Sequence, residues 1–371
     1  MRHARRGVAL VLVLLALATL GATAVALLAA AAALRDDARG SLAALQARAL
    51  AASAVAGVWG DWDGAARVDD SVGAVDESML ASAAAVATVQ RARLHDQLWW
   101  VAADARALMT MRQRPVRHAA ALALHLAVPL LEPPAAVSTA GSVTLVAGAL
   151  VTGGDSVPPS WPCRSEMGGA SPSYALLRAS GGSLLAPAPS IRGADVSFVP
   201  GTAGDPRPAW ERARSVLVAV ANVYPVAGTP LTPTPTARDG QCTDDATSWG
   251  EPDRAAPGVP PCRRRWVVVH ARHPLTVTGG RAQGILLSDS ALEFAAGARF
   301  TGLILARGAV HLSAAAVVGA VVMLGDSGGS PAPLSLSAGA TVSRSRCAVL
   351  AALLGGPTLA PADPGGWLTL W

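Results

Sequence analysis

The strongest pattern of hydrophobic and polar positions lies in the first 60 residues. Arginines stand at positions 2, 5 and 6, and after Gly7 an unbroken apolar run extends from Val8 to Leu34. As an α-helix this run is about 40 Å long, more than the roughly 30 Å hydrocarbon core of a bilayer. The pattern therefore predicts a basic leader over residues 1–7 and a transmembrane helix over residues 8–34.

The charges that flank this run predict its orientation. The basic residues all precede it, whereas the mixed-charge sequence Arg35-Asp36-Asp37 follows it. Because basic flanks stay in the cytoplasm, we expect a single-pass protein with a cytoplasmic N-terminus and an exported remainder. A cleaved secretory signal ending at Ala22-Thr23-Ala24 is the alternative, but the apolar run continues ten residues beyond that site, which favours a retained helix.

The helix is expected to continue past the bilayer. Apolar residues recur every three or four positions at Leu42, Leu45, Ala49, Ala52 and Val55, which predicts a single apolar stripe. Three glycines at positions 57, 60 and 64 then end the pattern. Residues 35–60 are therefore interpreted as an amphipathic continuation of the same helix.

The next region has strand-like and ambiguous parts. Residues 122–128 alternate leucine or valine with other residues, and residues 97–103 contain two tryptophans; both patterns predict strands. The acidic, glycine-containing residues 60–77 are typical of a loop, and residues 141–152 of a hairpin or a short pair of strands. The alanine-rich residues 81–93 fit a helix or a strand equally well.

Residues 153–265 are rich in Pro, Gly and Ser and predict an irregular region. Within it, Thr229–Thr236 alternates proline with threonine and is expected to be extended and exposed. Val216–Val223 has the clearest pattern of an ordered element here. Trp266–His270 is expected to form a strand that leads into the next region.

A degenerate repeat occupies residues 280–345. Its landmarks are Gly284, Gly302 and Gly319, spaced 18 and 17 residues apart and each followed by three apolar or alanine residues. Stacked rungs could bury apolar faces that no single rung can bury alone, so the repeat predicts a short β-solenoid of roughly three rungs. An ordinary β-meander with coincidental spacing remains the alternative. The segment Gly325–Pro333 is expected to be an inserted loop on one face.

Composition restricts the compartment and the function classes. Four cysteines, Cys163, Cys242, Cys262 and Cys347, lie in the expected exported part, where disulfides are favoured. They allow three pairings, of which Cys242–Cys262 joins the nearest neighbours in sequence. The chain contains no lysine, and its net charge of +5 is mild. No cluster of basic and aromatic residues predicts a nucleic-acid surface.

The N-terminal sequence Arg5-Arg6-Gly7-Val8, followed by a long apolar helix with an amphipathic half, resembles PilX-type minor pilins and other type IV pilin-like proteins. The glycine-led repeat of residues 280–345 looks like the solenoid tail of some bacterial pilus-assembly proteins and is loosely similar to the bactofilin repeat. The first resemblance covers residues 1–60, and the second covers the repeat.

The resemblance implies a bacterial inner-membrane protein that a prepilin peptidase could cut between Gly7 and Val8. Its partners would be the lipid bilayer and other pilin-like subunits, which contact it through the N-terminal helix. The chain departs from the usual pilin pattern at two positions: Leu12 replaces the glutamate at the fifth mature position, and Val8 replaces a common phenylalanine. These departures fit a minor or initiating subunit, or an uncleaved anchor, better than a major subunit.

Two short motifs suggest chemistry, and both have simpler interpretations. Residues 325–329 read GDSGG, the string around the nucleophilic serine of trypsin-like proteases, but no histidine stands in the matching context. His270 and His273 lack a third metal ligand nearby and would face opposite sides of a strand. The acidic loop around Cys242 does not have the spacing of a calcium-binding EF-hand. We therefore predict no catalytic, cofactor or metal site.

Taken together, the sequence predicts an α+β protein: a long transmembrane and amphipathic helix, then a β-rich ectodomain that ends in a short β-solenoid. The expected segments are residues 1–7, 8–34, 35–60, an α/β pilin-like region at 61–152, an irregular region at 153–265, the repeat at 266–345 and a C-terminal tail or cap at 346–371. The expected function is non-enzymatic: assembly and surface display in a type IV pilus or related secretion apparatus. A membrane-tethered scaffold that binds envelope partners without a pilus is the alternative, and a secreted hydrolase using Ser327 is a remote one.

Overall fold

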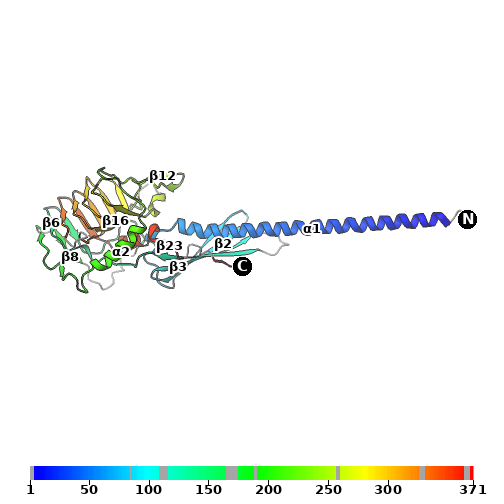
Figure 1. Ribbon diagram of the computed structural model, residues 1–371, viewed down its shortest axis with the longest axis horizontal. Helices are drawn as coiled ribbons and strands as arrows, with labels where there is room; N and C mark the ends of the chain where they lie inside the picture. The colour runs from blue at the N-terminus through cyan, green and yellow to red at the C-terminus, as the bar shows by residue number, and fades with distance from the viewer. Residues whose placement is uncertain are drawn as a thin grey trace.

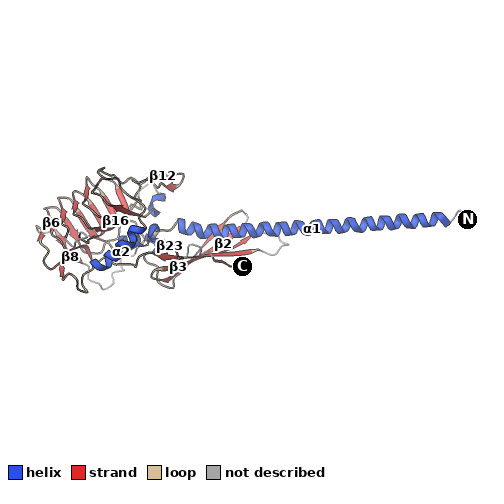
Figure 2. Cartoon of the chain, viewed as in Figure 1, coloured by secondary structure: helices blue, strands red, loops and turns tan. Residues whose placement is uncertain are grey.

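A computed structural model describes residues 4–83, 85–107, 116–163, 174–187, 190–255, 260–325, 331–362 and 368–370. The chain is α+β: one long helix, α1 (Ala4–Gly60), projects from a β-rich body (Figures 1 and 2). This confirms the predicted order, an apolar N-terminal helix followed by a β-rich part. The helix includes residues of the predicted leader, because it begins at Ala4.

The first part of α1 is exposed from Leu10 onward, as far as the described residues show. Its most apolar window lies in the stretch that starts at Leu10, and none of that window is buried. Leu27 and Leu28, for example, are each 71% exposed. This segment is long and apolar enough to be a single membrane span or a signal anchor.

The second part of α1 packs on an antiparallel sheet. The order is β1-β2-β3-β4, and two C-terminal strands both pair with β4. The six strands are β1 (Val75–Ala81), β2 (Ala85–His95), β3 (Leu98–Ala107), β4 (Arg117–Leu126), β23 (Leu359–Pro361) and β24 (Leu368–Leu370). The end of the chain therefore returns to the sheet that lies beside the N-terminal helix.

The face that α1 turns to the sheet differs from the predicted stripe. The buried residues are Ala43, Ala47, Ala51 and Ala54, together with Val55, whereas Leu42 and Leu45 are exposed. Small side chains let the helix approach the sheet closely, so the alanines are selected for the interface although the leucines are more hydrophobic. The prediction of an amphipathic continuation is confirmed, but the predicted phase of its apolar stripe is wrong.

Two parallel sheets form the rest of the β-rich body. The first has the order β10-β7-β22-β20-β18-β16-β14 with β5, β8 and β11 branching from β20, and the second has the order β15-β17-β19-β21-β6-β9. The first sheet comprises β5 (Ala135–Thr139), β7 (Leu150–Thr152), β8 (Tyr174–Ala179), β10 (Ile191–Arg192), β11 (Ala194–Phe198), β14 (Val267–Ala271), β16 (Arg281–Ser288), β18 (Arg299–Ala306), β20 (Ala316–Met323) and β22 (Thr341–Arg344). The second comprises β6 (Val143–Leu145), β9 (Leu184–Leu185), β15 (Leu275–Thr278), β17 (Leu292–Ala295), β19 (Val310–Leu312) and β21 (Leu334–Leu336).

The repeat contains runs of consecutive apolar residues because the first parallel sheet is buried on both faces. In β16, Leu286 packs in the core shared with the second sheet, whereas Ile285 and Leu287 pack on the opposite side, in the core that includes the helix and the antiparallel sheet. A strand covered on both faces is expected to be continuously apolar instead of alternating. The same register repeats in β18 and β20, where Gly302 pairs with Gly284 and Gly319 pairs with Gly302.

The parallel sheets extend beyond the predicted repeat. Residues 141–152 do form two short strands, but β6 joins the second sheet and β7 joins the first, so they are not a hairpin. The predicted irregular region contributes β8 to β11 and a helix, α2 (Arg207–Ala219). Segments far apart in sequence thus continue the same stacks: β7 pairs with β22 across about 190 residues.

Smaller elements complete the body. They are η1 (Gly64–Arg67), the hairpin β12 (Ala237–Arg238) and β13 (Gln241–Cys242), η2 (Pro260–Arg264), α3 (Arg346–Leu353) and η3 (Gly356–Thr358). Helix α3 packs against η1 and against β16, β18 and β20. It therefore lies between the end of α1 and the first parallel sheet.

The remaining local predictions have mixed outcomes. The strand over 122–128 is confirmed, with Leu122, Leu124 and Leu126 buried in β4. The strands predicted over 97–103 and 266–270 correspond to β3 and β14, and the ambiguous residues 81–93 lie mostly in β2. The loop predicted over 60–77 is wrong in part, because β1 begins at Val75 as a fully exposed edge strand without hydrophobic alternation.

Candidate functional site at the junction of helix and β-rich body

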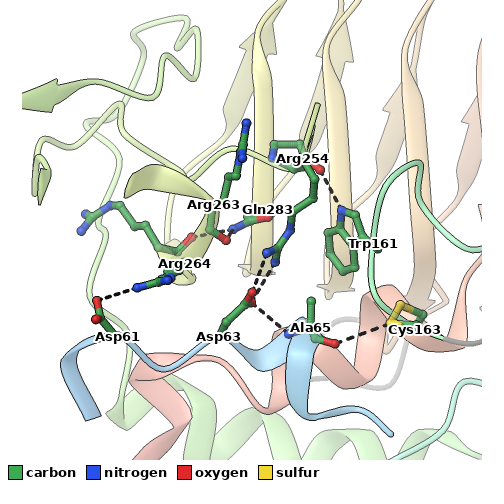
Figure 3. A network of polar contacts seen from close by, with 12 residues as sticks. Asp61, Asp63, Ala65, Trp161, Cys163, Arg254, Arg263, Arg264 and Gln283 are labelled. Atoms are coloured by element: carbon green, nitrogen blue, oxygen red, sulfur yellow. Dashed lines mark hydrogen bonds and ion pairs between the residues drawn. A yellow bond between two sulfur atoms is a disulfide. The ribbon is translucent and has the colours of Figure 1, made fainter. Parts of the chain in front are cut away.

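The sharpest cluster of polar contacts lies where α1 ends and the parallel sheets begin (Figure 3). After Gly60 the chain turns into Asp61, Trp62 and Asp63, and η1 starts at Gly64. The Asp63 side chain caps η1 by accepting a hydrogen bond from the Ala65 amide at 3.1 Å. The capping aspartate is thereby fixed in position to face the β-rich body.

Asp63 also forms the central ion pair of this junction. Arg254 donates two hydrogen bonds to its carboxylate, one of them of 2.8 Å between Nη2 and Oδ1. Both side chains are largely buried, at 12% exposure for Arg254 and 14% for Asp63. A bidentate ion pair of this kind fixes the relative orientation of the two side chains as well as their distance. It therefore holds the end of α1 against the loop that carries Arg254.

Two tryptophans pack beside this ion pair, one against Arg254 and one next to Asp63 in the sequence. The Arg254 guanidinium lies 5.3 Å from the ring centroid of Trp161, and Trp161 donates a 2.7 Å hydrogen bond to the Pro252 carbonyl. Trp62 packs edge-on against Trp99 of β3 at 5.9 Å and donates a 2.9 Å hydrogen bond to the Leu354 carbonyl. The junction thus connects α1, the antiparallel sheet and the segment after α3 through buried, directional contacts.

A covalent link reinforces the same place. The disulfide Cys163–Cys347 joins the segment that follows Trp161 to the start of α3, and the Cys163 sulfur lies 3.8 Å from the Ala65 carbonyl oxygen. Gly64 permits a close approach here, because a Cβ at this position would stand 2.1 Å from the Ala351 carbonyl oxygen of α3. The disulfide, the buried ion pair and the tryptophan hydrogen bonds together fix the end of α1 to the β-rich body.

The outer rim of the junction is weaker. Asp61 pairs with Arg264 at 2.8 Å, but the two side chains are 73% and 53% exposed. Gln283 of β16 donates 2.9 Å hydrogen bonds to the carbonyls of Arg263 and Arg265 and so positions η2 beside the pair. The rim pair therefore provides a matched control for the buried one.

We expect Asp63→Asn to destabilise the protein by about 1–3 kcal/mol, because it leaves a buried guanidinium without its counter-charge. Asp61→Asn should change stability by less than about 0.5 kcal/mol, since exposed pairs contribute little. Urea unfolding of the detergent-solubilised full chain, followed by tryptophan fluorescence, measures both. Equal effects of the two variants would contradict the assignment of the junction to Asp63.

The structure places the sequence-predicted residues in several locations. Of the three pairings that the sequence left open, the structure has the one with the nearest neighbours joined: Cys242 is bonded to Cys262, and Cys163 to Cys347. Gly284, Gly302 and Gly319 lie side by side on neighbouring strands. The leader residues Arg5, Arg6, Gly7 and Val8 lie in the first turns of α1.

Other candidate residues are dispersed or lie outside the description. Ser327 of the GDSGG string lies outside the described residues. The acidic residues near Cys242 face arginines: Asp244 pairs with Arg265, whereas Glu251 and Asp253 pair with Arg281 at 3.0 and 3.1 Å. Within the described residues no group of three or more His, Cys, Asp or Glu side chains is placed to hold a metal ion.

The expectation that His270 and His273 face opposite sides of a strand does not apply, because only His270 lies on one. Strand β14 ends at Ala271, so the alternation of side chains stops before His273, and both histidines line one pocket. The junction residues Asp63 and Arg254 were not predicted at all. Their only sequence signal is the acidic Asp61-Trp62-Asp63 immediately after the helix-ending glycine.

Comparisons with known proteins give no match: no family model fits the sequence, and no curated protein or solved structure is detectably similar.

Proposed function

We propose that this protein is a membrane-anchored, pilin-like subunit that assembles with related subunits through α1 and carries its β-rich body outside the membrane. The observation that supports this most is the division of one continuous helix, Ala4–Gly60, into two parts. The first part is apolar and is not buried by any part of the chain that the structure describes, whereas the second part packs on an antiparallel sheet through an alanine face. A helix of this kind can move between a bilayer and a bundle of subunits without unfolding the sheet beside it.

Small residues on the free part of α1 support helix–helix assembly. Gly21, Ala22, Ala26, Ala29 and Ala30 lie in the unburied segment and permit close approach of a second helix. Arginines before the apolar run support a cytoplasmic N-terminus, and two disulfides fit an exported body. We further infer that the two parallel sheets are faces of one β-solenoid, because their strands stack in the same sequence order and share a core.

N-terminal sequencing of the protein extracted from its native membrane tests the proposal. Processing at the leader would give a start at Val8. Gly7→Leu should block this cut and leave the seven leader residues attached. The product would then be about 0.9 kDa heavier, because each residue adds ~0.11 kDa and arginine adds more. Gly21→Ala is the matched control, because a Cβ at Gly21 meets no neighbouring atom. A start at Met1 in every sample would instead support a tethered scaffold that acts through its stacked sheets.

A further inference from the structure

An open pocket lies at the corner that follows β14, away from the junction. Its lining consists of Tyr224, Pro225, His270, Arg272 and His273, and its volume is about 360 Å³. This is within the range of small-ligand sites. The pocket has no role in the proposed assembly, so its chemistry is an independent question.

His270 is the buried member of this pocket. Only 5% of it is exposed, and its Nε2 lies 2.8 Å from Oδ2 of Asp289. Because an ionised carboxylate can only accept, the ring nitrogen Nε2 donates this hydrogen bond. Nδ1 is buried and has no partner within the described part of the chain.

Asp289, the partner of this ring, is itself held in place by an arginine. Arg214 of α2 also pairs with Asp289, which anchors the carboxylate between the helix and β14. Burial lowers the pKa of the Arg214 guanidinium from its ordinary value, while the charge of Asp289 acts in the opposite direction. Asp289 is therefore already engaged by two groups and does not neutralise the rest of the pocket.

Arg272 supplies positive charge at the mouth. Its guanidinium lies 5.5 Å from the ring centroid of Tyr224, and both side chains are exposed. No carboxylate lines the pocket, and Arg272 makes no ion pair with any residue that the structure describes. His273, also exposed, is the remaining polar group.

We propose that this pocket binds an oxyanion group, phosphate or carboxylate, carried on a body of about the size of a sugar. Arg272 is free to pair with the oxyanion, because the ring of Tyr224 supports it and no protein carboxylate competes. Tyr224 and Pro225 provide apolar surface for the body of the ligand. A divalent metal fits less well, because only two histidines are present and Arg272 repels a cation.

The chain contains only two tyrosines, Tyr174 and Tyr224, which makes a direct test available. Full-length protein labelled with 3-fluorotyrosine should give two ¹⁹F resonances, of which Tyr174 on β8 serves as the internal reference. Glucose 1-phosphate and glucuronate are titrated separately to about 10 mM, a range that detects millimolar affinity. We expect a saturable shift of the Tyr224 resonance with at least one of them, and their relative affinities identify phosphate or carboxylate as the natural group.

Variants and control ligands make the test decisive. Arg272→Gln should weaken binding about tenfold or more, as expected for loss of a charge-assisted pair, and Arg299→Gln, an equally exposed arginine at the start of β18, should not. Glucose should give no saturable shift, and inorganic phosphate should bind more weakly than glucose 1-phosphate. The proposal is overturned if neither anion shifts Tyr224, if Arg272→Gln binds like the parent protein, or if zinc chloride alone produces the shift.

Discussion

Gly302→Ala should destabilise the protein by more than about 4 kcal/mol, a large effect for a single added methyl group. Gly302 lies in the middle of β18 with φ of +137°, a conformation that L side chains rarely adopt. A Cβ at this position would stand 2.0 Å from the carbonyl oxygen of Gly284 on the neighbouring strand. The added Cβ would be attached to the backbone of β18, and the oxygen belongs to the backbone of β16. Parallel pairing fixes both strands, so neither can move without breaking their register.

Thermal unfolding followed by circular dichroism measures this effect against another glycine with a positive φ. Gly297 has φ of +82°, but a Cβ there meets no atom within 4 Å. Gly297→Ala should therefore cost only the backbone strain, about 1–2 kcal/mol. If Gly302→Ala yields no folded protein at all, the prediction holds; equal melting temperatures for the two variants would contradict it.

The same glycines show what the sequence could predict about the fold. Their spacing predicts strands that stack in register, and the structure pairs Gly284, Gly302 and Gly319 directly. The apolar triplets that follow them are informative because burial on both faces demands continuous hydrophobicity. Sequence periodicity thus captures elements whose partners are one repeat away.

Sequence periodicity does not predict strand pairs whose members lie far apart in the sequence. Strands β5, β6 and β7 pair with β20, β21 and β22, yet their sequences are short and contain no glycine at the repeat phase. The edge strand β1 is exposed on both faces, so no hydrophobic alternation marks it. Such pairings are decided by tertiary contacts and not by local pattern.

The amphipathic half of α1 shows a related failure. Hydrophobicity alone favours Leu42 and Leu45 as the buried face, but the sheet packs on Ala43 and Ala47. Close packing of the helix on the sheet requires small side chains at the interface. The hydrophobicity of the sequence does not reveal the distance between the helix and the sheet, so it does not predict this requirement. The junction was missed for a comparable reason, because Asp63 and Arg254 lie 191 residues apart.

Removal of the junction disulfide should have a larger effect than removal of the local one. Cys163 and Cys347 close a loop with a sequence separation of 184, compared with 20 for Cys242 and Cys262. On the chain-entropy account, the long loop contributes about 5 kcal/mol and the short one about 3 kcal/mol at 25 °C. We therefore expect the double variant Cys163→Ser/Cys347→Ser to lose about 2 kcal/mol more stability than Cys242→Ser/Cys262→Ser.

The position of the long-range disulfide adds a structural consequence to the entropic one. Cys347 begins α3, which packs between η1 and the first parallel sheet, so its loss frees the element that joins α1 to the β-rich body. Limited proteolysis of the detergent-solubilised variant should then cut between the two parts before either part is degraded, whereas the Cys242→Ser/Cys262→Ser variant should be cut first near β12 and β13. Urea unfolding under the same conditions gives the stabilities. If the two double variants unfold at the same urea concentration and give the same early fragments, Cys163–Cys347 does not brace the junction, and the noncovalent contacts of Asp63 and Trp62 hold it instead.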